Sequence, residues 1–452
     1  MAVQINEKLF GTDGIRGEAG GFPLDEETVR IIGASLARRL LDRLGRRPRL
    51  ITGRDTRESG GWIEQAFHDG AASENAELAS AGVITTPGVA FLTRHFDFDA
   101  GIVISASHNP YQDNGIKIFS PTGKKIDSET ERAIEQDIFA GLYVAAERSA
   151  RISSDTEDEY QTAYIDHLTS EFPSLRLEGL KIVIDCANGA ASRLAPRLFN
   201  GLGAEVVAIN DRPDGRNINE GCGSLHLEQL QTMVLEEDAG LGVAFDGDAD
   251  RALYVDERGK VVDGDAALWI LAQHLSARGG LTNKTVVATV MSNIGLEIAL
   301  ASAGLKLVRT TVGDKYVLDE LIKSGSELGG EQSGHIILPL KSLVGDGMVT
   351  TLVVLEAIRE RKATLSEAIR GFMRYPQVLV NVRVREKQPF ENVDEIASAA
   401  QRIESQLDGN GRLLLRYSGT ENLARVMIEG KDQSMIERQA NELADVIRQK
   451  LA

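Results

Sequence analysis

The chain has 452 residues, with 50 Lys and Arg against 67 Asp and Glu and a formal net charge of −17. Its 42% hydrophobic and 26% charged residues are ordinary for a globular protein and exclude the disordered class. The acidic balance argues against a general nucleic-acid binder, although clustered Arg and Lys could still hold a small anionic substrate. Two cysteines, Cys186 and Cys222, exclude a disulfide framework, and no stretch is apolar for long enough to span a membrane. We therefore expect a soluble, cytoplasmic protein.

The first regular element that the sequence predicts is a helix over 25–44. Asp25 is a suitable N-cap, and Gly45 is a suitable residue to end the helix. The apolar residues that recur at spacings of three and four are Val29, Ile32, Leu36 and Leu40.

Four later segments share one pattern, in which a short apolar run ends in a polar loop that contains glycine or proline. They are 99–110, 180–189, 240–251 and 283–295. Continuous Val, Ile and Leu runs are typical of strands covered on both faces, as in parallel sheets, and helical stretches lie between them. In such α/β domains ligands bind beyond the carboxyl ends of the strands, so these loops are where a site is expected.

The boundaries between domains are less sharply marked. The polar stretch 143–178 is typical of a helix that crosses between domains, and a glycine turn at 256–260 could close a second domain. Alternation over 378–385 predicts an antiparallel strand, and apolar periodicity over 433–451 predicts a last helix. We expect three α/β domains and a smaller α+β domain. Their predicted limits are 1–152, 153–258, 259–374 and 375–452.

The strongest single motif is DGDADR, which places Asp246, Asp248 and Asp250 at alternate positions after an apolar run. Such a cluster repels itself unless a cation is present, and its oxygen ligands favour Mg²⁺ or Ca²⁺. The spacing also fits an EF-hand, but Arg251 stands where that loop needs glycine. A solvated acidic turn remains the alternative.

A second motif is SASHNP, in which Ser107 stands between Ala106 and His108 and could be a nucleophile. A helix cap or a turn hydroxyl are its alternatives, and no GxSxG nucleophile elbow is present. Lys117, in DNGIK, could shuttle a proton or contact phosphate, or be an ordinary surface charge.

Three further loops indicate anion or sugar binding. FGTDGIRG carries Arg16, a plausible phosphate ligand. RYSGTEN predicts a phosphate cradle made of backbone N–H groups, hydroxyls and a guanidinium. GEQSGH, if extended, would turn alternate side chains to one face and could grip sugar hydroxyls, although its histidine could also be structural. The candidate residues of RYSGTEN are Arg416, Ser418, Gly419 and Thr420, and those of GEQSGH are Glu331, Ser333 and His335.

Together the five motifs resemble the α-D-phosphohexomutase superfamily, in order and spacing and along essentially the whole chain. The segments VDG (262–264), MSNIGLE (291–297) and VGDKYV (312–317) also match. The resemblance implies four domains around a central cleft, three of them related α/β domains and the fourth smaller.

The resemblance also implies roles for individual residues. Ser107 would be a phosphoserine, and Asp246, Asp248 and Asp250 would bind one Mg²⁺ per chain together with a phosphoseryl oxygen. Lys117 would be the acid/base group, with a pKa lowered by Arg16 and Mg²⁺. The remaining implied residues are His108 with Arg16 for catalysis, Arg251, Glu331, Ser333, His335 and Lys315 for the substrate, and Arg416, Ser418, Gly419, Thr420 and Arg425 for the distal phosphate.

The implied reaction is an isomerisation, in which phospho-Ser107 donates its group to a sugar monophosphate. A hexosamine 1,6-bisphosphate would then be both intermediate and activator. GEQSGH, with glutamine at position 332, resembles the same motif in the glucosamine branch of the superfamily. This resemblance implies glucosamine 6-phosphate and glucosamine 1-phosphate as the substrate pair. Mannose or glucose phosphates, a phosphosugar hydrolase and a non-catalytic phosphosugar sensor are the alternatives.

Two residues depart from the family pattern, Ala249 where glycine is usual and Asn422 where proline is usual. Ala249 reduces the backbone freedom of its loop, and Asn422 borders the predicted phosphate cradle. The expected partner is a small hexosamine phosphate substrate, and we expect the protein to bind neither nucleic acid nor a membrane. Whether the chain forms a homodimer is left open.

Overall fold

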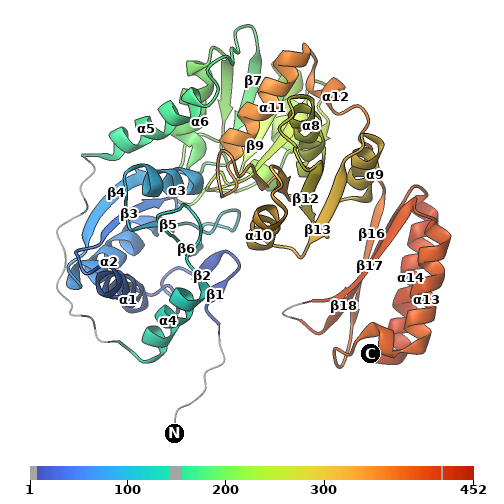
Figure 1. Cartoon of the computed structure of the whole chain (residues 1–452), viewed down its shortest axis with the longest axis horizontal. Helices are drawn as coiled ribbons and strands as arrows, with labels where there is room; N and C mark the ends of the chain where they lie inside the picture. The colour runs from blue at the N-terminus through green and yellow to red at the C-terminus, as the bar shows by residue number, and fades with distance from the viewer. Residues whose placement is uncertain (1–7, 143, 145–151, 153–154, 419–420) are drawn as a thin grey trace. The chain divides into compact units, whose positions relative to one another are not determined.

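The computed structural model describes residues 8–142, 144, 152, 155–418 and 421–452 (Figure 1). The chain forms two compact units. The first combines Met1–Met291 with Val308–Ile369, and the second combines Ser292–Leu307 with Arg370–Ala452. Among the described residues, no helix combines the length and the apolar character that a membrane span requires.

The first unit begins with a six-stranded sheet in the order β1-β2-β6-β5-β3-β4. Its strands are β1 (Phe10–Gly11), β2 (Gly14–Glu18), β3 (Arg49–Arg54), β4 (Glu77–Val83), β5 (Ala100–Ile104) and β6 (Asp113–Phe119). Its helices are α1 (Glu26–Leu44), α2 (Gly60–Ser73), α3 (Thr86–His95) and α4 (Ser128–Phe139). β3 is parallel to β4 and β5, whereas β6 is antiparallel to β5 and β2. The sheet is therefore mixed, not wholly parallel as the apolar runs predicted.

Helix α1 confirms the predicted caps. The Asp25 side chain accepts a hydrogen bond from the Thr28 N–H, and Gly45 has φ 64° and donates its N–H to the Leu41 carbonyl. The four predicted apolar residues are all buried in the core of this domain. Local sequence signals and packing agree here, so the helix forms where the periodicity places it.

A second sheet, in the order β11-β10-β9-β7-β8, follows in the same unit. Its strands are β7 (Lys181–Asp185), β8 (Glu205–Ile209), β9 (Leu241–Phe245), β10 (Ala252–Asp256) and β11 (Val261–Val262). The helices around it are α5 (Glu157–Ser170), α6 (Ala191–Gly201), α7 (Glu228–Glu236) and the short η1 (Gly223–Leu225). The turn at 256–260 lies inside the β10–β11 hairpin, and the predicted limit at 258 falls within it. The four domain limits stay predictions.

A third sheet has the order β13-β12-β14-β15. Its strands are β12 (Thr285–Thr289), β13 (Lys306–Thr310), β14 (Gly329–Gly330) and β15 (Ile336–Ile337). The accompanying helices are α8 (Gly264–Ala277), α10 (Asp314–Ser324), α11 (Gly347–Arg361) and α12 (Leu365–Ala368).

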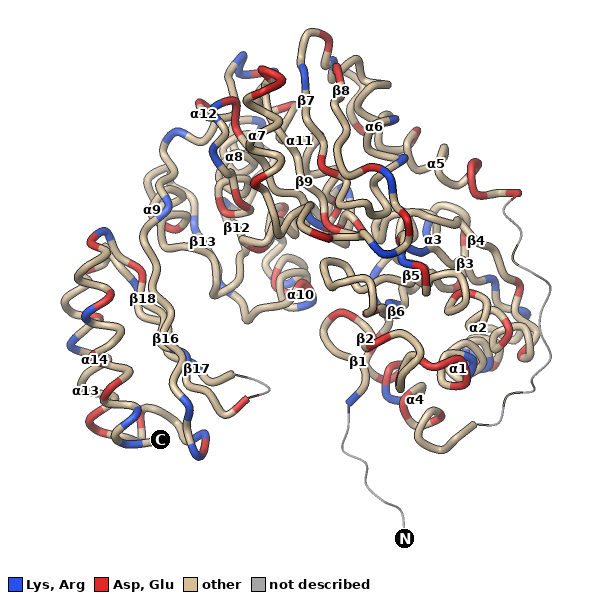
Figure 2. Tube along the Cα trace, turned by 180° about the vertical axis from the view of Figure 1, so that it is seen from behind, with Lys and Arg blue, Asp and Glu red and all other residues tan. Residues whose placement is uncertain are grey.

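The second unit is built on an antiparallel three-stranded sheet, in the order β16-β18-β17. Its elements are α9 (Ile294–Ser302), β16 (Gln377–Arg383), η2 (Phe390–Asn392), α13 (Asp394–Leu407), β17 (Gly411–Tyr417), β18 (Leu423–Gly430) and α14 (Gln433–Leu451). Buried Glu429 links α9 to the sheet, because it accepts hydrogen bonds from the Ile294 N–H and the Arg412 Nε. The predicted strand over 378–385 and helix over 433–451 correspond to β16 and α14. Figure 2 shows Lys and Arg interspersed with Asp and Glu along α13 and α14, with no basic stripe on these helices.

Four sheets with these helices confirm the predicted class, three α/β domains and a smaller α+β domain. β5 and β9 end at the two strongest motifs. The loops after them hold Ser107 and the acidic cluster.

Candidate active site

Ser107 lies in the loop after β5, in a left-handed conformation with φ 53°. The residue is fully buried, and its N–H donates to Ser105 Oγ at 2.9 Å. Its hydroxyl donates to Asp246 Oδ2 in a short hydrogen bond and lies 3.2 Å from His108 Nδ1. Tertiary folding thus brings together two predicted residues that are 139 positions apart.

The Ser107 loop is held by side chains that the predicted site does not include. Arg57 donates to the carbonyls of Asn109, at 2.6 Å, and Ser107, at 3.3 Å, and pairs with buried Asp55. Asn219 donates to the same two carbonyls, at 3.0 and 2.9 Å. The signal in the sequence is GRDTR, where Asp55 and Arg57 follow the buried strand β3 at alternate positions. Four hydrogen bonds to the carbonyl oxygens of Ser107 and Asn109 oppose rotation of the strained Ser107 backbone.

The three aspartates of DGDADR converge as predicted. One carboxylate oxygen from each of Asp246, Asp248 and Asp250 lies within 4.8 Å of the others, and all three residues are buried. Burial raises the pKa of Asp246 well above its usual value, and the charges of Asp250 and Asp248 raise it further. Asp248 Oδ1 is buried with no hydrogen-bond partner among the described residues. A convergent set of carboxylate oxygens with an unsatisfied oxygen fits a hard divalent cation such as Mg²⁺.

Lys117, on β6, is buried against this cluster. Its ammonium lies 2.8 Å from Asp248, 3.1 Å from Asp13 and 3.5 Å from Asp250. Burial lowers the pKa of Lys117, but these three carboxylates outweigh burial and hold the pKa well above its usual value. The predicted lowering of this pKa is wrong for the metal-free protein, because the Arg16 charge acts against three carboxylates.

A cavity of about 380 Å³ opens beside the cluster. The predicted residues that line it are Arg16, His108, Asp250, Arg251, Glu331 and His335. Burial lowers the pKa of His108 to about 4, and the charges of Arg251 and Arg16 act in the same direction. Burial also lowers the pKa of His335, but the Asp250 charge outweighs it and the pKa rises to about 9. Arg16, Arg251 and a protonated His335 offer donors to an anionic group, whereas Asp13, Asp250, Asp314 and Glu331 give the same cavity four carboxylates.

The GEQSGH segment is a tight turn between β14 and β15, so the condition for its alternate side chains to share one face, an extended segment, is not met. The Glu331 N–H donates to the His335 carbonyl, and the Gly334 N–H donates to the Glu331 carbonyl. Glu331 and His335 reach the cavity, whereas Ser333 is not among its lining residues. The short antiparallel pairing of β14 with β15 bends the chain back on itself, which period-two alternation cannot reveal.

Lys315 is not brought to the aspartate cluster. It lies in the first turn of α10, its ammonium donates to Ser128 Oγ at 3.2 Å, and it lines another cavity, of about 310 Å³.

The predicted phosphate loop belongs to the second unit. Arg416 on β17 is the register partner of Arg425 on β18, and burial together with the Arg425 charge lowers the pKa of Arg416. Ser418 Oγ accepts hydrogen bonds from the Glu421 N–H, at 3.3 Å, and from Arg425, at 3.5 Å. Two adjacent guanidiniums beside a hydroxyl fit a phosphate group. Gly419 and Thr420 lie outside the described residues.

Two further residues near this loop are informative. Lys387, absent from the predicted site, donates to the Ser418 carbonyl at 2.8 Å. Asn422 accepts the Val384 N–H through its backbone carbonyl at 2.9 Å, a contact that a proline at this position could also make. The departure at Asn422 therefore preserves this strand contact.

The departure at Ala249 leads to a first prediction. Ala249 is buried with φ 54°, a region that costs a non-glycine residue roughly 1 kcal/mol. We expect Ala249→Gly to raise the free energy of unfolding by about 0.5–1 kcal/mol, measured by chemical denaturation, with activity unchanged. Ala244→Gly, in the regular strand β9, is the matched control and should destabilise the protein. If both variants destabilised the protein, the claim that the backbone at Ala249 is strained would be wrong.

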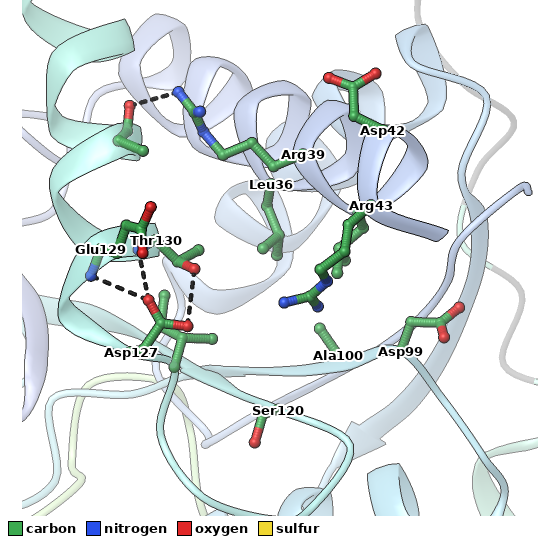
Figure 3. A pocket seen from close by; sticks show the side chains of 13 residues that line it. Leu36, Arg39, Asp42, Arg43, Asp99, Ala100, Ser120, Asp127, Glu129 and Thr130 are labelled. Atoms are coloured by element: carbon green, nitrogen blue, oxygen red, sulfur yellow. Dashed lines mark hydrogen bonds between the residues drawn. The ribbon is translucent and has the colours of Figure 1, made fainter. Parts of the chain in front are cut away.

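A separate cavity of about 530 Å³ lies between α1 and α4 (Figure 3). Most of its polar groups are used in bonds within the domain. Arg39 donates to the Ala133 carbonyl, Asp127 accepts from the first turn of α4, and Asp99 pairs with Arg46. None of the predicted site residues lines this cavity, so the aspartate cluster remains the candidate active site.

Comparisons with known proteins identify the family of the chain. Residues 7–144, 162–259 and 263–375 match the alpha/beta/alpha domains I, II and III of phosphoglucomutase/phosphomannomutase, and 379–446 match its C-terminal domain. A phosphoglucosamine mutase of Solibacter usitatus is 50% identical over 443 residues, which are 98% of this chain and 99% of that protein. A phosphoglucosamine mutase of Deinococcus deserti is 48% identical over 445 residues, 97% of this chain and 98% of that protein.

Solved structures share the fold. A phosphoglucomutase/phosphomannomutase family protein of Burkholderia thailandensis has a TM-score of 0.79 at 24% identity, covering 98% of this chain and 97% of its own. N-acetylphosphoglucosamine mutase of Aspergillus fumigatus, solved with GlcNAc-6P and magnesium, has a TM-score of 0.66 at 18% identity, covering 98% and 96%. With four domain matches in order and relatives about half identical over nearly its whole length, the chain belongs to the phosphoglucomutase/phosphomannomutase family, the phosphohexomutases.

Proposed function

We propose that this chain acts as a phosphoglucosamine mutase, an isomerase that interconverts glucosamine 6-phosphate and glucosamine 1-phosphate. The observation that carries the proposal is the bond between the buried Ser107 hydroxyl and Asp246, within a cluster of three aspartates. A hydroxyl held against an acidic cation site, beside a cavity lined by Arg16 and Arg251, has the parts that phosphoryl transfer requires.

In the proposed reaction the active protein carries a phosphate ester on Ser107. The free hydroxyl of the sugar monophosphate attacks this phosphorus, the bond from phosphorus to the Ser107 oxygen breaks, and a hexosamine 1,6-bisphosphate results. The bisphosphate reorients, and the Ser107 oxygen takes the other phosphoryl group, which regenerates the phosphoserine and releases the isomer. One proton leaves the sugar hydroxyl and one returns to the sugar, so the cycle is balanced.

The residues of the chain divide this work. Arg16, Arg251 and protonated His335 line the cavity and would hold the phosphate and sugar of the substrate, together with Glu331. Lys117, protonated in the metal-free protein, would stabilise charge on the transferring group and donate a proton to the leaving oxygen. Asp246, Asp248 and Asp250 would hold Mg²⁺. When bound, Mg²⁺ would offset the carboxylate charge and polarise the transferring phosphoryl group.

The choice of sugar is supported by the relatives named phosphoglucosamine mutase rather than by Gln332. The Gln332 side-chain amide donates to Asp263 at 3.3 Å, and Gln332 is not among the residues that line the cavity. The test offers glucosamine, glucose and mannose 6-phosphates separately, at equal concentration, with Mg²⁺ and a trace of hexose bisphosphate, and follows the products by phosphorus NMR. Fastest formation of glucosamine 1-phosphate supports the proposal, and preferred mannose or glucose conversion overturns the sugar choice. Release of free phosphate without isomer would indicate a hydrolase.

A prediction follows for the phosphate loop. Arg416→Ala should raise the KM for glucosamine 6-phosphate about tenfold, because a guanidinium contact to phosphate is lost. The Mg²⁺ concentration for half activity should not change. Arg438→Ala, on the exposed face of α14, is the control, and equal effects from both variants would argue against a phosphate contact at Arg416.

The same proposal includes a cytoplasmic location and a homodimer. Cell fractionation tests the location, and light scattering of the purified protein tests the homodimer.

A further inference from the structure

Lys125 joins two parts of the first unit that are far apart in the chain. Its ammonium lies 2.7 Å from Asp13 Oδ1 and 2.7 Å from Asp314 Oδ2, and it also donates to the Thr12 carbonyl at 3.1 Å. The Lys125 and Asp314 side chains are 20% and 19% exposed, so water screens this bridge only partly. Lys125 follows β6 in the N-terminal domain, whereas Asp314 is the first residue of α10, 189 positions further on.

At its Asp13 end the bridge contacts Arg16 and Lys117, two residues with proposed roles in phosphoryl transfer. Asp13 uses its other oxygen to pair with Arg16 and, at 3.1 Å, with Lys117. The charges of Lys117 and Lys125 together outweigh burial and lower the pKa of Asp13, so the carboxylate is ionised. Lys125 is therefore separated from both catalytic cations by a single carboxylate.

At its Asp314 end the bridge lies next to Gly313, which contacts Glu331, the residue proposed to hold the sugar. Gly313, directly before Asp314, donates its N–H to Glu331 Oε1 at 3.1 Å. Lys315, directly after it, donates to Ser128. A movement of the 313–315 segment would therefore displace the partner of Glu331.

The bridge also stands between two cavities. Thr12 and Asp314 line both the cavity of about 380 Å³ beside the aspartates and the cavity of about 310 Å³ next to α10. Without the Lys125 ammonium, no cation would lie between the carboxylates of Asp13 and Asp314. Two partly buried like charges repel, which would separate the two segments.

We propose that Lys125 is a positioning residue that couples Asp314, at the start of α10, to Lys117 and Arg16. Through the neighbouring Gly313 the coupling extends to Glu331, the residue proposed to hold the sugar. Substrate binding at Glu331 and the geometry of phosphoryl transfer would then depend on one bridge, Asp13–Lys125–Asp314. This inference rests on the proposed function. Its physical content, the coupling of the two segments, is also measurable without turnover.

The test compares four variants with the wild-type chain. Lys125→Met removes the ammonium and keeps most of the side-chain volume, whereas Lys125→Arg keeps a cation that can contact both carboxylates. Asp314→Asn is combined with Lys125→Met, because it removes one of the two repelling charges. Lys124→Met is the matched control, since the neighbouring Lys124 ammonium makes no recorded ion pair in the described part of the chain.

We expect Lys125→Met to lower kcat for glucosamine 6-phosphate about tenfold and to raise its KM about fivefold. Lys125→Arg should keep most of the activity, and adding Asp314→Asn to Lys125→Met should recover kcat about threefold. Hydrogen exchange should become faster at the amides of 311–318 in Lys125→Met and not in Lys124→Met. A lower kcat with unchanged KM and no recovery in the double variant would show a loss of folded protein only, and would overturn the proposal.

The outcomes keep the two proposals apart. If the wild-type chain does not isomerise glucosamine phosphate, the proposed function fails, and hydrogen exchange still tests the bridge. If the wild type is active and Lys125→Met behaves as Lys124→Met in kinetics and exchange, the function stands and the coupling role of Lys125 is refuted.

Discussion

Ser107→Ala is expected to lower isomerisation at least about 10⁴-fold, because the variant has no oxygen to carry the phosphoryl group between the two positions of the sugar. Binding of the sugar phosphate should be largely retained, since Arg16, Arg251 and Glu331 line the cavity independently of this hydroxyl. Turnover is measured by phosphorus NMR and binding by calorimetry.

Two further observations make this prediction specific to the serine. Intact mass should show one phosphate on the active wild type and none on Ser107→Ala. Ser405→Ala, on the exposed face of α13, is the matched control and should keep both activity and phosphate. Turnover retained in Ser107→Ala would refute the phosphoserine assignment.

Asp246→Asn is expected to have opposite effects on activity and on the stability of the metal-free protein. Activity should fall at least about 100-fold, and the Mg²⁺ concentration for half activity should rise, because one of three carboxylate ligands loses its charge. Without metal, the variant should unfold at a higher temperature than the wild type. The folded state raises the pKa of Asp246, so its ionisation destabilises the fold as pH rises, and asparagine removes that cost.

The measurement is thermal unfolding at pH 7.5 with EDTA and with Mg²⁺, beside a Mg²⁺ titration of activity. The wild type should gain stability from Mg²⁺, and Asp246→Asn should gain little. Glu236→Gln, which removes an exposed carboxylate from the same domain, should behave as the wild type. A Mg²⁺ stabilisation of Asp246→Asn equal to that of the wild type would exclude this aspartate as a ligand.

Much of the fold follows from local signals in the sequence. Asp25 and Gly45 mark the ends of α1 because capping depends on a few neighbouring residues. The short apolar runs become β5, β7, β9 and β12, and the polar loops after β5 and β9 carry Ser107 and the three aspartates of the candidate site. The spacing of Asp246, Asp248 and Asp250 predicted a cation site, with a solvated acidic turn as its alternative. The folded chain brings one oxygen from each carboxylate within 4.8 Å of the others.

Other features of the site depend on residues that meet only in the folded chain. The clamp of Arg57 and Asn219 on the Ser107 loop joins positions 112 apart, and no local pattern marks such a pair. The turn at Glu331 arises from the pairing of β14 with β15, which alternation of residue types does not encode.

The sequence by itself therefore determined α1, α14, β16, the strands at the four apolar runs, the alternate spacing of the three aspartates and the order of the functional loops, because each of these depends on neighbours along the chain. The tertiary structure alone decided which charges surround each group. Lys117 shows the physical reason, since its pKa depends on Asp13, 104 positions before it, and on Asp248 and Asp250, more than 130 positions after it. Coulomb interactions in a buried site are governed by distance in space, and that distance is set only when the sheets and loops pack together.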